Sequence, residues 1–241
     1  MRKITTVRPY ITFAAIIVYT VVAGVLVIVA GLFDYKGRMY DLISRVWSNA
    51  ILYTAGIKVT IEGLDNVDRN TPHIFMSNHL SHLDTAAFIA KIPFRIRFFA
   101  KKELLRVPVF GQALYMSRHI IIDRKNTEKA KKSISDAKER IRRYGLSVLV
   151  FPEGTRSTTG KLGEFKKGGF VLAIEAGIPI VPIAVKGSLE LLPAHTLLVR
   201  SGRIRINIGR PIAAADYTRD TKQALMGKVR AEIERLGLQS G

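Results

Sequence analysis

The sequence predicts an α/β protein with a mixed, largely parallel-type sheet flanked by helices, preceded by two N-terminal helices that form a membrane anchor. Two observations support this prediction. After residue 57, short runs of β-branched and aromatic residues alternate with segments of helical periodicity. Before it lies an uncharged stretch long enough to cross a bilayer. We therefore divide the 241 residues into an anchor, 1–55, and one α/β domain, 56–241, large enough for a full core.

The first predicted helix runs from Pro9 to Phe33, where no residue is charged. A helix of this length can cross the roughly 30 Å of hydrocarbon in a bilayer, and its apolar part is longer than that of a cleavable signal peptide. The positive-inside rule assigns no orientation, because equal numbers of basic residues flank the stretch: Arg2, Lys3 and Arg8 before it, and Lys36, Arg38 and Arg45 after it.

The second predicted helix, Met39–Ala55, has apolar residues at helical spacing, with Trp47 as an interfacial anchor. We expect the two helices to form an antiparallel hairpin inserted in one leaflet of the membrane. A single spanning helix is the alternative topology. The sequence favours neither of two locations for the second helix: it can pack on the α/β core or lie on the membrane surface.

Within the α/β domain, segments rich in β-branched and aromatic residues predict seven strands, at Lys58–Ile61, His73–Met76, Ile96–Ala100, Ile120–Ile122, Ser147–Phe151, Ile180–Val185 and Ile204–Ile208. Helical periodicity and C-terminal glycines predict the helices, at Asp84–Lys91, Thr127–Tyr144 with Gly145 as C-cap, Gly169–Ala176 with Gly177 as C-cap, and Thr221–Leu236. No internal repeat, low-complexity segment or linker divides this region.

The composition points to a polyanionic partner, because 38 Lys and Arg residues against 19 Asp and Glu residues give a formal charge of +19. Nucleic acid and an anionic membrane both fit this charge. The sequence has no recognisable nucleic-acid-binding module but has the hydrophobic N-terminal stretch. We therefore expect anionic membrane lipids as partners and no nucleic acid. The absence of cysteine excludes disulfides, thiolate metal sites and a cysteine-linked intermediate.

Candidate catalytic residues lie in the segment 77–84, where an apolar run gives way to helical sequence. His79 and Asp84 stand five residues apart, and a neutral imidazole oriented by a carboxylate can act as a general base towards an alcohol. Ser81 and Asp84 also have the spacing of a helix capping box, which alone would explain both of them. Capping does not explain His79.

A second candidate motif, 151–157, follows a predicted buried strand. Its Gly154, Thr155 and Arg156 combine backbone N–H groups, a hydroxyl and a guanidinium, a set that binds phosphate. An ordinary glycine-containing turn is the alternative interpretation. A serine nucleophile is disfavoured because the sequence contains no G-x-S-x-G elbow, so direct transfer to the acceptor is the preferred chemistry.

Together the two motifs resemble the glycerolipid acyltransferase family, whose four sequence blocks occur here in order. The resemblance covers roughly residues 58–208, and its blocks are Asn78-His79-x-Ser81-x-x-Asp84, Lys101-x2-Leu104-x6-Gly111-x12-Arg124, Glu153-Gly154-Thr155-Arg156-Ser157 and Ile180-Val181-Pro182-Ile183. Ile121 departs from the family pattern, in which many members carry Phe before the Asp-Arg pair. Both residues are apolar, so the departure bears on detail rather than on function.

The resemblance implies an O-acyltransferase of phospholipid biosynthesis, which transfers a fatty acyl group from an acyl thioester to the sn-2 hydroxyl of lysophosphatidic acid. It implies His79 as the general base and Asp84 as its orienting partner, with Asn78 and Ser81 in support. The acceptor would be bound by a set of residues around its glycerol phosphate, comprising Lys101, Arg124, Glu153, Gly154, Thr155 and Arg156.

The resemblance further implies acyl-CoA or acyl-acyl carrier protein as the donor substrate, with no bound cofactor and no metal site. The catalytic domain would lie on the cytoplasmic face of the cell membrane. Three alternatives stay open: an acyltransferase that uses glycerol 3-phosphate or another lysolipid, a catalytically inactive membrane-binding protein, and a nucleic-acid-binding protein. The inactive protein would not need the His79 and Asp84 pair, and the nucleic-acid-binding protein would show strongly salt-dependent binding.

Overall fold

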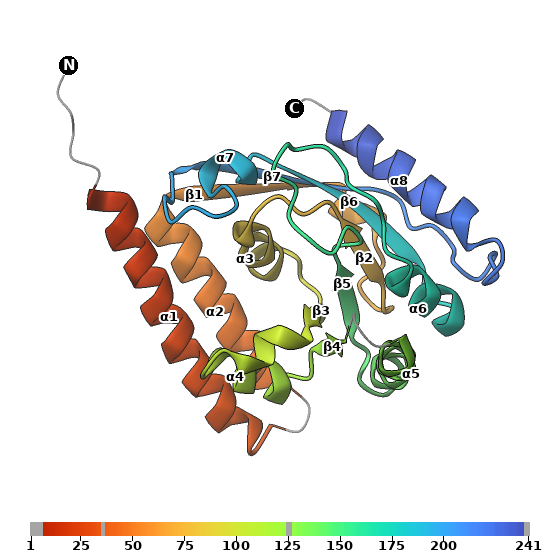
Figure 1. The fold of residues 1–241 in the computed structure, drawn as a ribbon, viewed down its shortest axis with the longest axis horizontal. Coiled ribbons are helices and arrows are strands. Elements are labelled where there is room, and N and C mark those ends of the chain that lie inside the picture. Colours follow the sequence, from red (N-terminus) through yellow and green to blue (C-terminus); the bar gives the residue numbers. More distant parts are fainter. Residues whose placement is uncertain (1–6, 35–36, 124–126, 239–241) are drawn as a thin grey trace.

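The computed structural model describes residues 7–34, 37–123 and 127–238 (Figure 1). Its strands are β1 (Ile57–Glu62), β2 (Ile74–Ser77), β3 (Ile96–Lys101), β4 (Ile120–Ile122), β5 (Ser147–Val150), β6 (Ile180–Lys186) and β7 (Gly202–Ile208). Its helices are α1 (Val7–Gly31), α2 (Arg38–Ala55), α3 (His82–Lys91), α4 (Phe110–Met116), α5 (Thr127–Tyr144), α6 (Gly168–Ala176), α7 (Ser188–Leu191) and α8 (Lys222–Leu238). Two short 3₁₀ helices are η1 (Leu64–Asn66) and η2 (Lys102–Arg106).

The strands form one mixed sheet in the order β1-β7-β6-β2-β5-β3-β4. Every neighbouring pair is parallel except β6 and β7, which run antiparallel. The carboxyl ends of β2, β3, β4, β5 and β6 therefore meet at one edge of the sheet, while β1 and β7 end at the opposite edge. The predicted mixed, largely parallel sheet is confirmed.

All seven predicted strands are present, each within two residues of its predicted bounds, and so are the predicted helices. The two strands at the centre of the sheet, β2 and β5, are buried along their whole length and apolar except for one terminal serine each, which made them recognisable. Sequence reasoning did not identify η1, η2, α4 and α7. These elements are too short for a helical period to be read; Pro108 separates η2 from α4, and Gly111 lies within α4.

Helices cover both faces of the sheet, with α2 and α3 on one face and α5, α6 and α8 on the other (Figure 1). The core consists accordingly of two clusters of buried apolar side chains, one on each face. Helix α2 contributes Ile51, Leu52 and Ala55 to the first cluster, each less than 5% exposed. One side of α2 thus packs on the core. This was one of the two locations that the sequence left open for this helix.

Helices α1 and α2 form an antiparallel hairpin along one flank of the domain (Figure 1). Trp47 Nε1 donates a hydrogen bond to Thr20 Oγ1 at 3.1 Å, and the hydroxyls of Tyr19 and Thr54 lie 3.2 Å apart. The outer side of α1 is apolar and exposed from one end to the other. Only 17% of the most hydrophobic 18-residue stretch of this helix is buried within the protein. By length and composition, Pro9–Gly31 could cross a membrane.

A polar cluster connects the start of α2 to the amino end of β3. The carboxylate of Asp41 accepts from Arg95 Nε at 2.7 Å and from Arg97 Nη1 at 2.6 Å. Arg97 is 1% exposed, and its guanidinium lies 4.4 Å from the centre of the Tyr40 ring. Because a buried guanidinium is stable only when paired, this cluster ties α2 to β3.

Tyr40 and His119 extend this cluster, and the hydrogen bonds fix the tautomer of the imidazole. Phe98 N donates to His119 Nδ1 at 2.9 Å, so Nδ1 carries no proton, and Nε2–H donates to the Tyr40 hydroxyl at 2.7 Å. Burial, with repulsion from Arg97, lowers the pKa of His119 from its usual 6.5 to about 3. Burial also raises the pKa of Tyr40 to about 12. Both side chains are therefore neutral near pH 7.

His119 should make the fold sensitive to acid. Its pKa is lower in the folded than in the unfolded state, so the unfolded chain binds the extra proton between pH 6.5 and about 3. The contribution of His119 to stability is complete above pH 6.5 and falls by about 1.4 kcal/mol per pH unit below it. We expect His119→Gln to flatten this dependence when the free energy of unfolding is measured in detergent micelles against pH. The exposed His195 supplies the control variant His195→Asn. Equal slopes for parent and His119→Gln would contradict the assignment.

Candidate active site

The first predicted motif forms the turn between β2 and α3. Helix α3 begins at His82, with Ser81 as its N-cap in extended backbone, and Ser81 Oγ accepts from Leu83 N at 3.3 Å. Asp84 Oδ2 reaches back to accept from Ser81 N at 2.8 Å and from Leu80 N at 2.7 Å. The capping box that the sequence predicted is therefore present, and it holds the Asp84 carboxylate at the start of the helix.

The same oxygen of Asp84 also meets His79. His79 Nδ1 lies 2.9 Å from Asp84 Oδ2, and the side chains are 15% and 0% exposed. A carboxylate accepts hydrogen bonds, so Nδ1 carries the proton and Nε2 is left as the basic nitrogen. Capping and orientation of the histidine are thus two functions of one carboxylate. Its other oxygen, Oδ1, is buried and has no hydrogen-bond partner among the described residues.

The two predicted supporting residues fix the turn to the rest of the domain. The side-chain amide of Asn78 donates to the carbonyl of Val185 at 2.9 Å and accepts from its N–H at 2.7 Å, which extends the pairing of β2 with β6. Ser81 Oγ donates to the carbonyl of Leu192 at 2.8 Å. Both bonds join residues more than 100 positions apart, so the backbone on either side of His79 is held by the core.

The second motif forms the loop after β5, and β5 lies beside β2 in parallel. The chain therefore leaves both strands at the same edge, and the two loops meet. Phe151 stacks on the His79 ring with centroids 3.9 Å apart and planes inclined by 13°. Ser157 N donates to the carbonyl of His79 at 2.7 Å. These contacts confine the imidazole to one plane.

Glu153 links its own loop after β5 to the loop that carries His79. It is 6% exposed, and its two carboxylate oxygens accept from different N–H groups, Oε1 from His79 N at 3.0 Å and Oε2 from Gly163 N at 2.8 Å. Within the described residues this carboxylate is therefore engaged with backbone. Its geometry suits positioning of the histidine and of the loop that ends near Gly163.

The remaining predicted residues lie around the same edge. Gly154, in the left-handed region with φ 72°, turns the chain so that Thr155 is exposed and Arg156 is half-buried. Partial loss of hydration lowers the pKa of the neighbouring His82, and the positive charge of Arg156 adds to that shift. Arg156 therefore lies within electrostatic range of the His82 imidazole.

Two predicted phosphate ligands come from the adjacent strands β3 and β4. Lys101 is the last residue of β3 and is exposed at the same edge of the sheet. Arg124, two residues beyond β4, lies outside the described residues. The structure thus brings Lys101 and the loops that carry His79 and Arg156 to one edge.

Sequence reasoning missed Phe151, Gly163 and Val185 as parts of the site. Phe151 was read as the end of a strand, and its stacking depends on β2 and β5 being neighbours, which no local pattern reveals. Gly163 and Val185 act through backbone groups. No residue type signals such a role.

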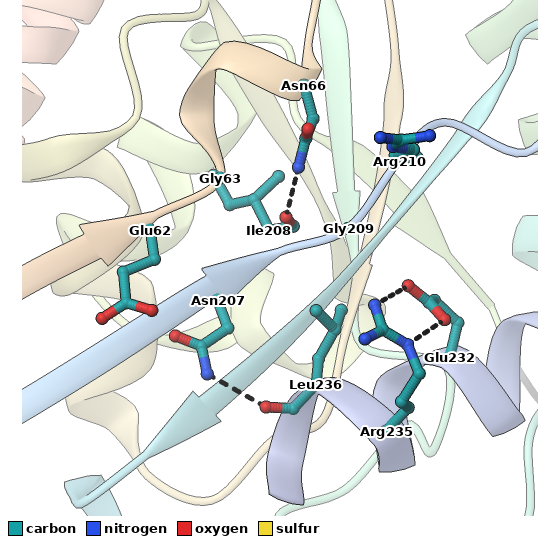
Figure 2. Close-up of a pocket in the computed structure, with 10 residues that line it drawn as sticks. All are labelled: Glu62, Gly63, Asn66, Asn207, Ile208, Gly209, Arg210, Glu232, Arg235 and Leu236. Atoms are coloured by element: carbon teal, nitrogen blue, oxygen red, sulfur yellow. Dashed lines mark hydrogen bonds and ion pairs between the residues drawn. The ribbon is translucent and has the colours of Figure 1, made fainter. Parts of the chain in front are cut away.

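A cavity of about 300 Å³ lies at the opposite edge of the sheet, where β1 and β7 end (Figure 2). Several of the polar groups around it already have partners: Arg235 pairs with Glu232, and Asn207 donates to the carbonyl of Leu236 at 2.9 Å. This cavity is remote from His79 because β7 runs antiparallel to β6. The candidate site is therefore the edge that carries the two motif loops.

Comparisons with known proteins place the chain in a family. A family model described as Acyltransferase matches residues 58–186. A 1-acyl-sn-glycerol-3-phosphate acyltransferase of Cocos nucifera is 32% identical over 89% of this chain and 69% of its own length. The alpha form of Homo sapiens is 33% identical over 75% of this chain and 64% of its own, and this chain spans 51% of a chloroplastic relative from Arabidopsis thaliana.

A solved structure shares the fold. The crystal structure of a 1-acyl-sn-glycerophosphate acyltransferase from Thermotoga maritima superposes with a TM-score of 0.80 at 22% identity and covers 100% of both chains. At this identity the likeness bears on the fold, and it includes the N-terminal hairpin as well as the α/β domain.

The geometry predicts different consequences for the two histidines of the first motif. His79→Ala should abolish turnover because the basic Nε2 is lost. His82→Ala should keep substantial activity because His82 is exposed and it is His79 that bonds to Asp84. Steady-state turnover of both variants, with circular dichroism to confirm the fold, checks this. The reverse ranking would assign the base to His82.

Asp84→Asn separates the two functions of this carboxylate. The amide oxygen can still accept from the N–H groups of the turn, so the capping is largely kept, while the negative charge beside the imidazole is lost. We expect turnover to fall by roughly 10²–10⁴, and the buried NH₂ without a partner to lower the free energy of unfolding by about 1–3 kcal/mol. A large loss of stability with activity retained would reduce Asp84 to a capping residue.

Proposed function

This chain belongs to the acyltransferase family, and we propose that it transfers a fatty acyl group from an acyl thioester to the sn-2 hydroxyl of lysophosphatidic acid, giving phosphatidic acid. The observation that supports this most is the contact between the two loops. An oriented imidazole and a loop with phosphate-binding groups lie at one edge of the sheet, joined by Glu153 and Phe151. The relatives named above share the acyl acceptor, 1-acyl-sn-glycerol 3-phosphate, in their names.

His79 is the general base. Its Nε2 removes the proton of the acceptor hydroxyl as the oxygen attacks the carbonyl carbon of the thioester, and the tetrahedral intermediate then expels the thiolate. The proton on Nε2 passes to the departing sulfur, so the imidazole is neutral again at the end. Asp84 holds Nδ1–H throughout and stabilises the transient imidazolium. Proton transfer of this kind contributes a factor of roughly 10²–10⁴.

Arg156, with Gly154 and Thr155, binds the phosphate of the acceptor. A guanidinium, an exposed hydroxyl and a turn of backbone N–H groups together give charge and direction to this contact. Lys101 and Arg124 add positive charge from the neighbouring strands. A phosphate held there fixes the distance from the glycerol hydroxyl to Nε2, and such positioning contributes as much as the proton transfer. Glu153 supports this arrangement through the backbone of His79.

The acyl donor is a thioester of coenzyme A or of acyl carrier protein. Neither donor is a resident cofactor, and the part of the chain that the structure describes has no group of His, Asp and Glu residues suited to a metal. The chemistry balances without one, because the leaving thiolate is a good nucleofuge and the imidazole returns the proton.

The hairpin of α1 and α2 attaches the protein to one leaflet of the membrane, with the catalytic domain on its cytoplasmic side. One side of α1 packs on protein, where Thr12, Val27 and Ala30 are buried, and the other side is apolar and exposed. A helix that crosses the bilayer alone would meet lipid all around. The one-sided burial of α1 therefore favours the hairpin over a single span.

One experiment tests the proposed reaction. The purified protein is incubated with lysophosphatidic acid and, separately, with each acyl thioester, and the lipid products are identified by mass spectrometry. Phosphatidic acid is expected with at least one donor. Glycerol 3-phosphate and lysophosphatidylcholine serve as competing acceptors. Acylation of either in preference to lysophosphatidic acid would contradict the assigned acceptor.

Arg156→Ala should impair use of the phosphorylated acceptor. Loss of a charged hydrogen bond to phosphate removes roughly 1.5–3 kcal/mol, so the ratio kcat/KM for lysophosphatidic acid should fall by about 10- to 150-fold, while the KM for the donor stays near that of the parent. Varying each substrate separately checks this. A defect confined to the donor KM would place Arg156 at the acyl carrier.

Charges on the outer side of α1 should release the protein from membranes. Val18, Val22 and Val25 are each about half exposed, and an ionised side chain facing lipid costs roughly 2–3 kcal/mol. We expect the triple substitution to Glu to abolish sedimentation with vesicles while turnover of a short-chain, water-soluble acceptor is kept. The matched control is Leu238→Glu, at an 81% exposed position on α8. Unchanged sedimentation of the triple variant would contradict the hairpin anchor.

A further inference from the structure

The segment 102–116, made of η2 and α4, presents apolar side chains that neither the catalytic site nor the hairpin explains. Leu104, Val107 and Tyr115 are 36%, 45% and 72% exposed. The segment follows β3, which is parallel to β5, so it leaves the sheet at the edge where the His79 loop lies. Figure 1 shows α4 in front of the lower halves of α1 and α2.

The backbone between η2 and α4 is strained at Val109. Its φ and ψ angles are 64° and −54°, and Phe110 N donates to the carbonyl of Pro108 at 2.7 Å, which makes a γ-turn with positive φ. A β-branched residue rarely adopts this conformation. Strain of this kind persists where the surrounding structure holds it, and it points to a function of the segment.

What holds Val109 is α1. A Cβ atom at Gly24 would lie 2.7 Å from Val109 Cγ1, and one at Gly31 would lie 2.7 Å from Met116 Cε. Glycines seven residues apart lie on the same side of a helix, and the two side chains that fill these notches are also seven residues apart. The segment is thus fixed to the anchor helix at two points.

The exposed apolar side chains of the segment continue the exposed side of α1. Ile17 and Val21 precede Gly24 by seven and three residues, so they lie on the same side of α1, and they are 50% and 46% exposed. Lys101 and Arg106 are exposed at the ends of η2. Apolar residues bordered by basic ones suit the boundary between acyl chains and anionic headgroups.

We propose that the segment 102–116 is a third membrane-contacting element, which inserts Val107 and Tyr115 into the same leaflet as the hairpin and meets anionic headgroups with Arg106. This inference rests on the proposed attachment of α1 and α2 to the membrane. It adds that the active-site edge itself touches the leaflet, so the headgroup of a lysophosphatidic acid reaches the His79 loop while its tail stays among lipids. The strained turn at Val109 sets the depth of the segment relative to α1.

Site-directed fluorescence tests the proposal on the full chain, since the protein contains no cysteine. Single variants Tyr115→Cys, Val22→Cys and Leu238→Cys carry an environment-sensitive fluorophore and are reconstituted into vesicles of phosphatidylcholine and phosphatidylglycerol with nitroxide-labelled lipid. We expect quenching at Tyr115 to be comparable to that at Val22 on the outer side of α1, with no quenching at Leu238 on α8. Turnover of a short-chain soluble acceptor confirms that each variant is folded, and Val107→Cys replaces Tyr115→Cys if that variant is not.

The outcomes separate the two proposals. If Val22 is quenched and the fluorophore on the segment behaves like that at Leu238, the hairpin anchor stands and the third contact is wrong. If Val22 is not quenched either, the membrane attachment itself fails. In a second measurement, Val107→Asp with Tyr115→Asp should lower turnover of long-chain acceptor in vesicles roughly tenfold and leave turnover of the soluble acceptor unchanged. An equal loss on both acceptors would overturn the proposal.

Discussion

A single carboxylate oxygen, Oδ2 of Asp84, organises the candidate active site. It accepts from the N–H groups of Leu80 and Ser81 and from His79 Nδ1, all within 2.9 Å. The backbone N–H groups at the start of α3 fix the position of this carboxylate. The carboxylate in turn fixes the orientation of the His79 imidazole. The Asp84 side chain is 0% exposed and is already held in place, so it loses little freedom in the reaction. Such preorganisation favours efficient general-base catalysis.

Sheet topology then decides which groups meet this base. Neighbouring parallel strands β2 and β5 end at one edge, so Phe151 stacks on the imidazole and Glu153 binds the His79 N–H. The same edge receives β3, and with it Lys101 and the segment 102–116. The hairpin contacts this segment at the Gly24 notch, and the Asp41 and Arg97 pair ties the hairpin separately to the amino end of β3. The proposed base, the proposed phosphate-binding loop and the proposed membrane contact therefore lie at one edge of the sheet.

Much of this could be predicted where the determinants are local. β-branched runs gave the seven strands within two residues, and the spacing of Ser81 and Asp84 gave the capping box. The order of the strands depends on pairings between residues about 70 positions apart. The stacking of Phe151 on His79 and the hydrogen bond from His79 N to Glu153 follow from that order. The turn at Val109 is invisible for the same reason, since its strain is held by Gly24, 85 residues earlier. Periodicity showed that α2 is amphipathic but not that Ile51 and Leu52 face the core.

The hydrogen bond from His79 Nδ1 to Asp84 fixes the imidazole as the Nδ1–H tautomer, with Nε2 free to accept a proton. Nitrogen NMR of the protein with labelled histidine, assigned through the loss of one signal in His79→Ala, reads this tautomer directly. We expect that near neutral pH the neutral His79 ring carries its proton on Nδ1, with a low-field proton resonance that disappears in Asp84→Ala. A His79 ring protonated on Nε2, or a spectrum unchanged by Asp84→Ala, would contradict it.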